Sequence, residues 1–396
     1  MDITINPHGL SGTVQAVPSK SQAHRLMICA AFSDRDTDLL CPVINEDMEA
    51  TADCLNSLGA SIRRTQNGFE ISPIKEVPAS ADLYCRESGS TLRFLLPICG
   101  ALGVNTAFHM EGRLPHRPLS PLWEEMERMG CILTMDETLH CTGKLIPGDY
   151  HIAGNVSSQF ISGLLFALAL IPGESKLTVK GKLQSAPYVK MTRDALSLFS
   201  VDTERETIGG SYPFHSPGTL AVEGDWSSAA FFLAADFMGN SVSIEGLNEN
   251  SSQGDSEISR ILPALTRKVT ISAADIPDLI PILSIAAAAS QGAVFTHIAR
   301  LRLKESNRVQ SVQNMLGALG CKTEATEDTL TVFPGKFSSC TIDAANDHRI
   351  AMAAAIAATA AQGPVTILGA ECVKKSYPCF WQDYKSLGGN YEQYIR

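Results

Sequence analysis

Six short polar turns, each followed by an apolar helix-like segment, recur along the 396 residues and constrain the fold more than any other feature. The turns carry Ser, Asp or Asn, which are residues that cap helices, and they begin near residues 19, 88, 157, 227, 278 and 347. Neighbouring starts are 69 or 70 residues apart, except that the fourth and fifth are 51 apart. A recurrence of this length predicts repeated supersecondary units that share a core, because one unit alone cannot bury its apolar face.

The segments between the starts also follow one pattern. Each apolar helix is followed by glycine and a short strand-like run, as at Val104–His109 and Val365–Leu368. About 40 residues after a start, a second amphipathic helix ends at Leu-Gly or a similar pair, as at Leu58-Gly59. The sequence therefore predicts an α/β (α+β) protein of six β-α-β-α-β-β repeats. The short fourth interval predicts that one repeat has lost a helix–strand portion.

Length, composition and charge limit the classes of protein that this chain can belong to. The chain is long enough for two domains, and 44% hydrophobic with 19% charged residues is typical of a globular protein. A net charge of −10 argues against a general nucleic-acid binder. A small anionic substrate remains compatible with this charge, because local basic clusters dominate the field inside a cleft.

The cysteines and apolar stretches indicate where the protein works. The 11 cysteines contain no CxxC pair, which favours a reducing compartment over a disulfide framework. The longest apolar stretches, such as Phe160–Pro172, are too short to span a bilayer, and no targeting segment precedes the first strand. We therefore expect a cytoplasmic protein without a membrane partner, and no metal, since no Cys/His cluster has metal-ligand spacing.

Basic residues occupy equivalent slots of the repeats. Lys20 and Arg25 lie at the first helix start, where backbone N–H groups and the helix dipole favour an anion. Other bases, together with the carboxylates Asp278 and Glu305, fall at the same end of their repeats: Arg117, Lys304, Arg308, Arg349 and Lys375. Such a set predicts a cationic site for one or two small anions that carry phosphate or carboxylate.

The motifs, in their order along the chain, resemble the 5-enolpyruvylshikimate-3-phosphate synthase (EPSP synthase, or 3-phosphoshikimate 1-carboxyvinyltransferase) family. The resemblance covers essentially the whole chain, and its most specific pieces are Lys304-Glu305-x-x-Arg308 and Asn346-Asp347-His348-Arg349. It also rests on Ser19-Lys20-Ser21-x-x-x-Arg25, Gly89-x-x-x-Arg93, Arg117-Pro118, Ser157-Ser158-Gln159, Ser216-Pro217-Gly218, Gln253-Gly254-Asp255, Pro277-Asp278 and Lys375-x-x-Pro378.

The resemblance implies a two-domain inside-out barrel with three repeats in each domain and the active site in the interdomain cleft. One domain would span residues 16–220 and provide most of the shikimate 3-phosphate side. The other would combine residues 1–15 with 222–396 and contain the shortened repeat. The cleft would close when substrate binds.

The resemblance further implies a reaction and its residues. The enolpyruvyl group of phosphoenolpyruvate would be transferred to the 5-hydroxyl of shikimate 3-phosphate, with release of phosphate, in the shikimate pathway of chorismate and aromatic amino-acid biosynthesis. The residues implied for shikimate 3-phosphate are Lys20, Ser21, Arg25, Ser157, Ser158, Gln159, Ser185, Tyr188, Asp278 and Lys304. Those implied for phosphoenolpyruvate are Lys20, Gly89, Arg117, Gln159, Arg308, Arg349 and Lys375.

The proposed chemistry is addition followed by elimination, and both steps move protons. We assign Asp278 as the base for the hydroxyl and Glu305 as the acid at C3, with Lys20 as the alternative acid. No cofactor is expected, because arginines and lysines carry the substrate charge. The partners are then the two small-molecule substrates only, and we expect a monomer.

Some residues depart from the family pattern. Glu87 stands where many relatives have Asn, and Phe94 stands where Pro often follows the Arg. Both residues flank Gly89, at which the inhibitor glyphosate would contact the family site. Arg300 falls where many relatives have a substrate-binding Asn, and we assign it no role.

Three alternatives differ in what they require. Enolpyruvyl transfer to a UDP-linked amino sugar would use a Lys-Asn start and a cysteine on a Gly-rich loop, whereas this chain has Lys20-Ser21 and no cysteine in 113–117. An RNA 3′-phosphate cyclase would need a catalytic histidine near the C-terminus and a nucleotide site. A non-enzymatic scaffold would need none of the bases and acids named above.

Overall fold

A computed structural model describes residues 1–210 and 212–394, and these form two compact units. The contiguous unit is Pro18–Val222. The discontinuous unit combines Met1–Val17 with Glu223–Arg396. Within the described residues, each unit is built from three helix pairs and three sheets.

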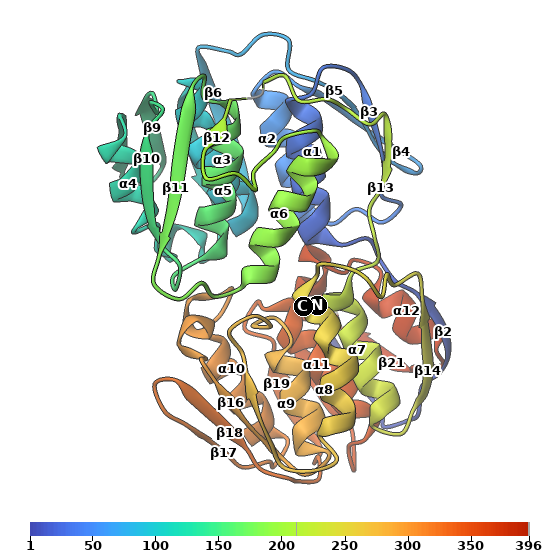
Figure 1. The fold of residues 1–396 in the computed structure, drawn as a ribbon. Coiled ribbons are helices and arrows are strands. Elements are labelled where there is room, and N and C mark those ends of the chain that lie inside the picture. The colour runs from blue at the N-terminus through green and yellow to red at the C-terminus, as the bar shows by residue number, and fades with distance from the viewer. Residues whose placement is uncertain (211, 395–396) are drawn as a thin grey trace. The chain divides into compact units, whose positions relative to one another are not determined.

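The contiguous unit places its most apolar helices inside and its sheets outside (Figure 1). The first helices of its repeats are α1 (Lys20–Ala31), α3 (Gly89–Leu102) and α5 (Ser158–Leu170). The second helices are α2 (Glu46–Ser57), α4 (Leu122–Arg128) and α6 (Ala186–Leu198). Nearly every residue of α3 and α5 is buried, which explains why these helices are apolar on all sides rather than amphipathic.

Three sheets surround these helices, with strand orders β13-β3-β5-β4, β6-β7-β9-β8 and β10-β11-β12. The strands are β3 (Thr37–Leu40), β4 (Ser61–Thr65), β5 (Gly68–Ser72), β6 (Ser80–Arg86), β7 (Asn105–Met110), β8 (Cys131–Met135), β9 (Leu139–Gly143), β10 (Asp149–Ala153), β11 (Glu174–Lys180), β12 (Ile208–Gly209) and β13 (Thr219–Ala221). A short 3-10 helix, η1 (Leu114–His116), precedes α4.

The discontinuous unit repeats this plan. Its first helices are α7 (Trp226–Phe237), α9 (Ile280–Ala288) and α11 (His348–Thr359), and its second helices are α8 (Ile258–Ala264), α10 (Arg308–Ala318) and α12 (Phe380–Ser386). The 3-10 helices η2 (Gly254–Glu257), η3 (Ala299–Leu303) and η4 (Ala370–Lys375) precede the second helices.

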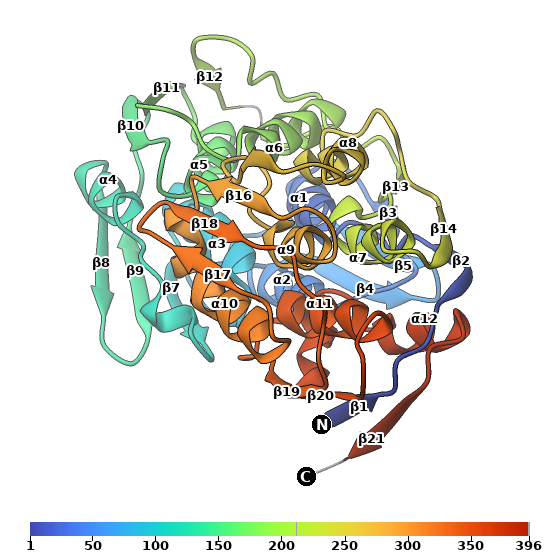
Figure 2. The ribbon, with the colours of Figure 1, turned by 90° about the horizontal axis from the view of Figure 1, so that it is seen from below.

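Its sheets have the orders β14-β2, β15-β16-β18-β17 and β19-β20-β1-β21. The strands are β1 (Asp2–Ile5), β2 (Ser11–Gln15), β14 (Ser241–Glu245), β15 (Val269–Ser272), β16 (Ala293–Thr296), β17 (Thr323–Ala325), β18 (Thr329–Val332), β19 (Cys340–Asp343), β20 (Val365–Leu368) and β21 (Tyr391–Tyr394). Figure 2 shows β1 beside β20, so the first strand of the chain lies in the last sheet.

Both units follow one rule of strand pairing. The strand before a first helix pairs in parallel with the strand after it, as β6 does with β7 and β15 with β16. A parallel pair needs a crossover connection, which the first helix provides. An antiparallel hairpin then extends the sheet, as β17 and β18 do. The predicted fold class of six β-α-β-α-β-β repeats is confirmed.

At each of the two chain crossings, the strand before a first helix pairs within its own unit rather than with the strand after that helix. Strand β2 leads into α1 but pairs with β14 of the discontinuous unit, from Ser11 opposite Ser241 to Gln15 opposite Glu245. Strand β13 leads into α7 but pairs with β3 of the contiguous unit. In an uninterrupted repeat, β2 would pair with β3 and β13 would pair with β14. Each of these two strands therefore occupies the position that the other would fill.

The fourth repeat is shortened in a different way from the one predicted. It keeps its second helix, α8, and its strand β14. What it lacks is the hairpin that follows α2, α4 and α10, because α8 connects directly to β15 whereas α2 is followed by β4 and β5. The prediction of a lost helix–strand portion was therefore wrong.

Five of the six first helices begin at a capping side chain. The cap oxygens of Ser19, Ser88, Ser157, Asp225 and Asp347 accept backbone N–H groups two or three residues later. The fifth helix differs, because α9 begins at Ile280 and its N-cap, Leu279, has no side-chain acceptor. Asp278 therefore lies in the turn before α9 rather than at the first position of the helix.

Two further sequence expectations concern the thiols and the helices. All eleven cysteines lie within the described residues and are free thiols. Among the residues that the structure describes, no helix combines the length and the apolar character that crossing a membrane requires.

Candidate functional site

The N-terminal residue of α1 forms an ion pair with the neighbouring helix. Lys20 Nζ lies 2.9 Å from Asp47 Oδ2, and both side chains are about one-sixth exposed. Asp47 belongs to the first turn of α2. No sequence pattern predicts this pair, because the two residues are far apart in the chain and meet only through the packing of α1 against α2.

Arg25, one turn further along α1, is buried against α6 and α5. Its Nε donates to Thr192 Oγ1 at 2.8 Å, its Nη1 to Ser21 O at 2.6 Å and its Nη2 to Tyr188 O at 2.9 Å. Burial lowers the pKa of Arg25 to about 10. These contacts hold three predicted substrate-binding residues, Ser21, Arg25 and Tyr188, in one cluster.

The start of α3 lies against two guanidinium groups. A Cβ atom built on Gly89 would lie 2.6 Å from Arg93 Nη1 and 2.7 Å from Arg117 Nη1. Arg93 Nη1 also donates to Gln159 Oε1 at 3.2 Å, and Gln159 Nε2 donates to Ser90 Oγ at 2.9 Å. The structure therefore brings Gly89, Arg117 and Gln159 together around the N-terminus of α3.

The third helix pair supplies small hydroxyl groups. Ser157 caps α5, with its Oγ accepting from Gln159 N at 3.3 Å, and Ser158 is the first residue of that helix. Ser185 precedes α6 in the left-handed conformation, at φ 57°, and makes no cap hydrogen bond of its own. An anion at the start of α5 would meet backbone N–H groups as well as these hydroxyls.

In the discontinuous unit, Arg308 is the centre of the predicted charge cluster. The side chain of Arg308 is fully buried and pairs with three carboxylates: Asp278 at 2.7 Å, Glu305 at 2.6 Å and Asp347 at 3.0 Å. Burial opposes the charge of the guanidinium, but the three carboxylates together raise the pKa of Arg308 above its ordinary value. Arg308 is therefore a permanently charged anchor of this cluster.

Asp278 is surrounded by cations. Besides Arg308, it lies 3.2 Å from Arg349 Nη2 and 3.6 Å from Lys304 Nζ. Burial favours the neutral acid, but Arg349, Lys304 and Arg308 outweigh this effect and hold the pKa of Asp278 well below its usual range. Burial in turn lowers the pKa of Lys304, and the nearby Asp278 and Glu305 offset part of that effect.

Two more groups complete this cluster. Lys375, at the end of η4, is buried and donates from Nζ to Asn346 O at 3.1 Å. Asp255, in η2, is buried, and burial together with the charge of Asp278 raises its pKa to about 7. The structure therefore brings Asp278, Lys304, Glu305, Arg308 and Arg349 together in the discontinuous unit, and Lys375 bonds to the backbone of Asn346, the neighbour of Asp347.

Sequence reasoning assigned no role to several residues that the structure places in these clusters. Arg93, Asp255 and Asp347 were visible in the quoted motifs, and Asp347 could have been found as a helix cap followed by two basic residues. Asp47 carried no such signal.

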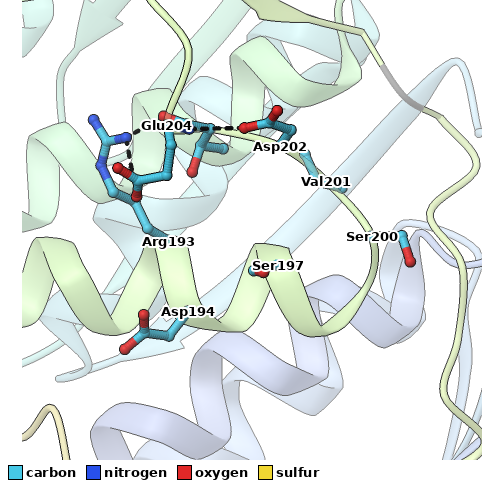
Figure 3. Close-up of a pocket in the computed structure, with 8 residues that line it drawn as sticks. Arg193, Asp194, Ser197, Ser200, Val201, Asp202 and Glu204 are labelled. Carbon is cyan, nitrogen blue, oxygen red and sulfur yellow. Dashed lines mark hydrogen bonds and ion pairs between the residues drawn. The ribbon is translucent and has the colours of Figure 1, made fainter.

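No metal site accompanies the two clusters. Within residues 1–210 and 212–394, no group of three or more His, Cys, Asp or Glu side chains could hold a metal ion. A hollow of about 370 Å³ lies beside the C-terminal half of α6, where Arg193 pairs with Glu204 at 3.5 Å and Asp202 accepts from Glu204 N (Figure 3). None of the predicted site residues lines this hollow.

The fold is shared with two solved structures of other proteins. It matches the solved structure titled EPSP synthase from Acinetobacter baumannii with a TM-score of 0.81, at 24% identity and covering 99% of both chains. It also matches the enolpyruvyl transferase NikO from Streptomyces tendae, with a TM-score of 0.77, 17% identity and coverage of 99% and 98%. At these identities the two likenesses define the fold class.

Sequence comparison identifies the family within that class. The profile of EPSP synthase (3-phosphoshikimate 1-carboxyvinyltransferase) matches residues 5–275 and 269–384. Proteins named 3-phosphoshikimate 1-carboxyvinyltransferase from Clostridium kluyveri and Clostridium acetobutylicum are each 36% identical, and one from Clostridioides difficile is 35% identical; each match covers 99% of this chain and 98% of the relative. The chain belongs to the EPSP synthase family.

Proposed function

We propose that this protein transfers the enolpyruvyl group of phosphoenolpyruvate to the 5-hydroxyl of shikimate 3-phosphate and releases phosphate. The observation that carries the proposal is the cluster of Lys304, Arg308 and Arg349 around the carboxylate of Asp278, within a chain that matches this family over its whole length. The cluster offers both the positive charge that a phosphorylated carboxylate substrate needs and an acceptor for a proton.

The contiguous unit supplies the groups proposed for shikimate 3-phosphate. The starts of α1 and α5 present Lys20, Ser21, Ser157 and Ser158 beside backbone N–H groups that favour an anion. Further groups in our assignment are Arg25, Gln159, Ser185 and Tyr188, with Asp278 and Lys304 from the discontinuous unit. The contacts of Arg25 support a double role, since the guanidinium fixes Ser21 and Tyr188 and keeps an Nη1 hydrogen for the substrate.

Phosphoenolpyruvate needs cations from both units in this proposal. Lys20, Gly89, Arg117 and Gln159 come from the contiguous unit, and Arg308, Arg349 and Lys375 come from the discontinuous one. We therefore propose that the units act as the two domains of one enzyme, 16–220 and 1–15 plus 222–396, and that their cleft closes over the substrates.

The proton transfers are assigned to the carboxylates. In the addition step, the oxygen of the 5-hydroxyl of shikimate 3-phosphate attacks C2 of phosphoenolpyruvate, and Asp278 accepts the hydroxyl proton. Glu305 delivers a proton to C3 of phosphoenolpyruvate, and Lys20 is the alternative donor. In the elimination step, the tetrahedral intermediate loses a proton from the methyl group formed at C3 and releases phosphate. A bound trianion would offset the positive charge around Asp278, so its proton affinity would rise when the substrates are present.

The free thiols support a reducing setting, and we propose that the enzyme works in the cytoplasm as a monomer without nucleic-acid or membrane partners. Size-exclusion chromatography with light scattering tests the monomer, because a dimer would elute at twice the 42.5 kDa chain mass.

The reaction itself is tested by phosphate release from phosphoenolpyruvate. Release is expected only when shikimate 3-phosphate is present. Release with a UDP-linked amino sugar in its place would assign the chain to the other substrate class, and release with neither acceptor would contradict both.

A further inference from the structure

Four buried polar side chains form a continuous hydrogen-bonded row between α1 and the start of α3. His24 Nδ1 lies 2.7 Å from Thr51 Oγ1, which lies 2.7 Å from Thr91 Oγ1, which donates to Ser88 Oγ at 2.7 Å. All four residues are 0% exposed. The row connects three helices, because His24 is in α1, Thr51 in α2 and Thr91 in α3.

The row ends at a position that the proposed function uses. Ser88 is the N-cap of α3, where its Oγ also accepts from Thr91 N at 3.3 Å. The next residue is Gly89, against which the guanidinium groups of Arg93 and Arg117 lie. The other end begins one helical turn from Lys20, since residues four apart share a helix face. The row thus connects the two helix starts that we assign to phosphoenolpyruvate.

Proton counting along the row gives it a direction. Each threonine hydroxyl has one proton to donate. Thr91 gives its proton to Ser88, so Thr51 must give its proton to Thr91, and the ring N–H of His24 at Nδ1 must then donate to Thr51. This order makes His24 a neutral imidazole with a bare lone pair at Nε2.

The surroundings of the ring agree with that order. His24 Nε2 is buried and has no hydrogen-bond partner among the described residues. The reverse order would place an N–H at Nε2, and a buried donor without an acceptor is costlier and rarer than a buried lone pair. Burial, and then the charges of Lys20 and Arg25, lower the pKa of His24 well below 6.5, which also favours the neutral ring.

We infer that His24 is a positioning residue that, as the Nδ1–H tautomer, fixes the start of α3 relative to Lys20 through Thr51, Thr91 and Ser88. The row would keep the Gly89 backbone and the adjacent Arg117 at a set distance from the cation of α1. The inference rests on the proposed binding of phosphoenolpyruvate by these groups, and it concerns a residue outside the proposed contacts.

The tautomer is tested directly in the substrate-free protein by NMR of histidine labelled with ¹⁵N. The His24 signals are assigned by their loss in His24→Asn. A protonated Nδ1 with a bare Nε2 at neutral pH is expected, whereas an Nε2–H tautomer or a doubly protonated ring would overturn the inference. This result does not depend on turnover, so it separates a failed inference from a failed proposed function.

Kinetics test the positioning role. Thr51→Val removes one hydroxyl at nearly constant volume and should raise the KM for phosphoenolpyruvate about tenfold, the scale of one buried hydrogen bond, with kcat and the KM for shikimate 3-phosphate nearly unchanged. Thr51→Ser restores the hydroxyl and should restore the KM. The matched control is Thr106→Val, a buried hydroxyl of β7 outside the row.

Equal KM values for phosphoenolpyruvate in Thr51→Val and Thr106→Val would overturn the positioning role. A KM that rises in Thr51→Val and stays raised in Thr51→Ser would overturn it too, since that pattern reports altered packing rather than a lost hydroxyl. If Thr51→Val does not fold, Thr91→Val cuts the same row one bond further along and carries the same expectation.

Discussion

Arg308 donates from Nη1 to Asp278 Oδ1 at 2.7 Å, and this contact joins the first residue of α10 to the turn before α9. Arg308 simultaneously holds Glu305 and Asp347, so its charge is already shared among three carboxylates. Arg349 and Lys304 each approach the same carboxylate from other elements. Asp278 therefore contacts three cations from separate parts of the discontinuous unit.

Asp278→Asn should separate catalysis from binding. The amide keeps the shape of the side chain but removes its basicity, and we expect kcat to fall by roughly 10²–10⁴-fold, the range of a lost general base. The KM for phosphoenolpyruvate should not rise, because three cations lose a competing anion. Steady-state phosphate release measures both constants.

Glu324→Gln is the control for Asp278→Asn, since Glu324 is an exposed carboxylate paired with Lys322. It should behave as the parent protein. Turnover of Asp278→Asn within a few-fold of the parent would contradict the base assignment and leave Lys20 and Lys375 as the candidates.

Arg349→Ala should weaken phosphoenolpyruvate binding. Arg349 is nearly buried and is oriented by its contacts with the side chain and backbone oxygen of Asp278. Losing a charge-assisted contact of this kind costs about 1.5–3 kcal/mol, so the KM should rise by roughly 10- to 150-fold. Arg302→Ala, which removes a guanidinium bonded to Thr326 O on the surface, is the control. Unchanged kinetic constants in Arg349→Ala would refute its assignment.

The hydroxyl groups at the start of α5 should recognise the phosphate of the acceptor. If Ser157, Ser158 and Arg25 hold that phosphate, shikimate without it loses several charge-assisted hydrogen bonds and should bind at least about 100-fold more weakly. Isothermal titration calorimetry compares the two ligands. Equal affinity for shikimate and its 3-phosphate would show that these residues do not bind the phosphate.

Gly89→Ala should disturb the start of α3. The new methyl group would come within 2.7 Å of the guanidinium nitrogens of Arg93 and Arg117, and these flexible ends would have to move. We expect a raised KM for phosphoenolpyruvate and a folded protein of near-normal stability. In contrast, Gly317→Ala in α10 has nothing within 4 Å. It should leave the kinetics unchanged and add roughly 0.5–1 kcal/mol of stability, as alanine does in a helix.

The buried His24 should make the free energy of unfolding depend on pH. Its pKa is lowered in the folded protein by burial and by Lys20 and Arg25, so below the ordinary value of 6.5 the unfolded chain binds a proton that the folded protein does not. This contribution to stability is fully present above that pH and is lost by about 1.4 kcal/mol for each further pH unit below it.

The measurement is urea unfolding of the parent and of His24→Asn at about pH 7 and about pH 5.5, within the window where the unfolded histidine titrates. The parent should lose more stability than the variant between the two values. Parallel losses in the parent and His24→Asn would show that His24 does not titrate differently on folding.

Local signals explain which features the sequence could predict. The caps Ser19, Ser88 and Ser157 and the apolar helices after them are encoded within a few residues, and the structure has them where the pattern indicates. The cations around Asp278 come from residues 304, 308 and 349, and no local pattern specifies these contacts.

Long-range pairing accounts for what the sequence did not show. The contact of Lys20 with Asp47 and the row from His24 to Ser88 depend on how α1, α2 and α3 pack, and no periodicity encodes the distance between two particular side chains. The shortened repeat was visible as a spacing of 51 residues, but spacing alone did not reveal that a hairpin, and not a helix, is missing.

The pairing of β2 with β14 and of β13 with β3 affects the order in which the chain can fold during synthesis. The contiguous unit can complete its sheets as soon as β13 has left the ribosome, because all of its strands lie within residues 18–222. Strands β1 and β2 emerge first but must wait for β20, β21 and β14. A ribosome-bound chain that extends far enough beyond Val222 for β13 to leave the exit tunnel should therefore carry a protease-resistant centre behind an N-terminal segment that is still open to cleavage.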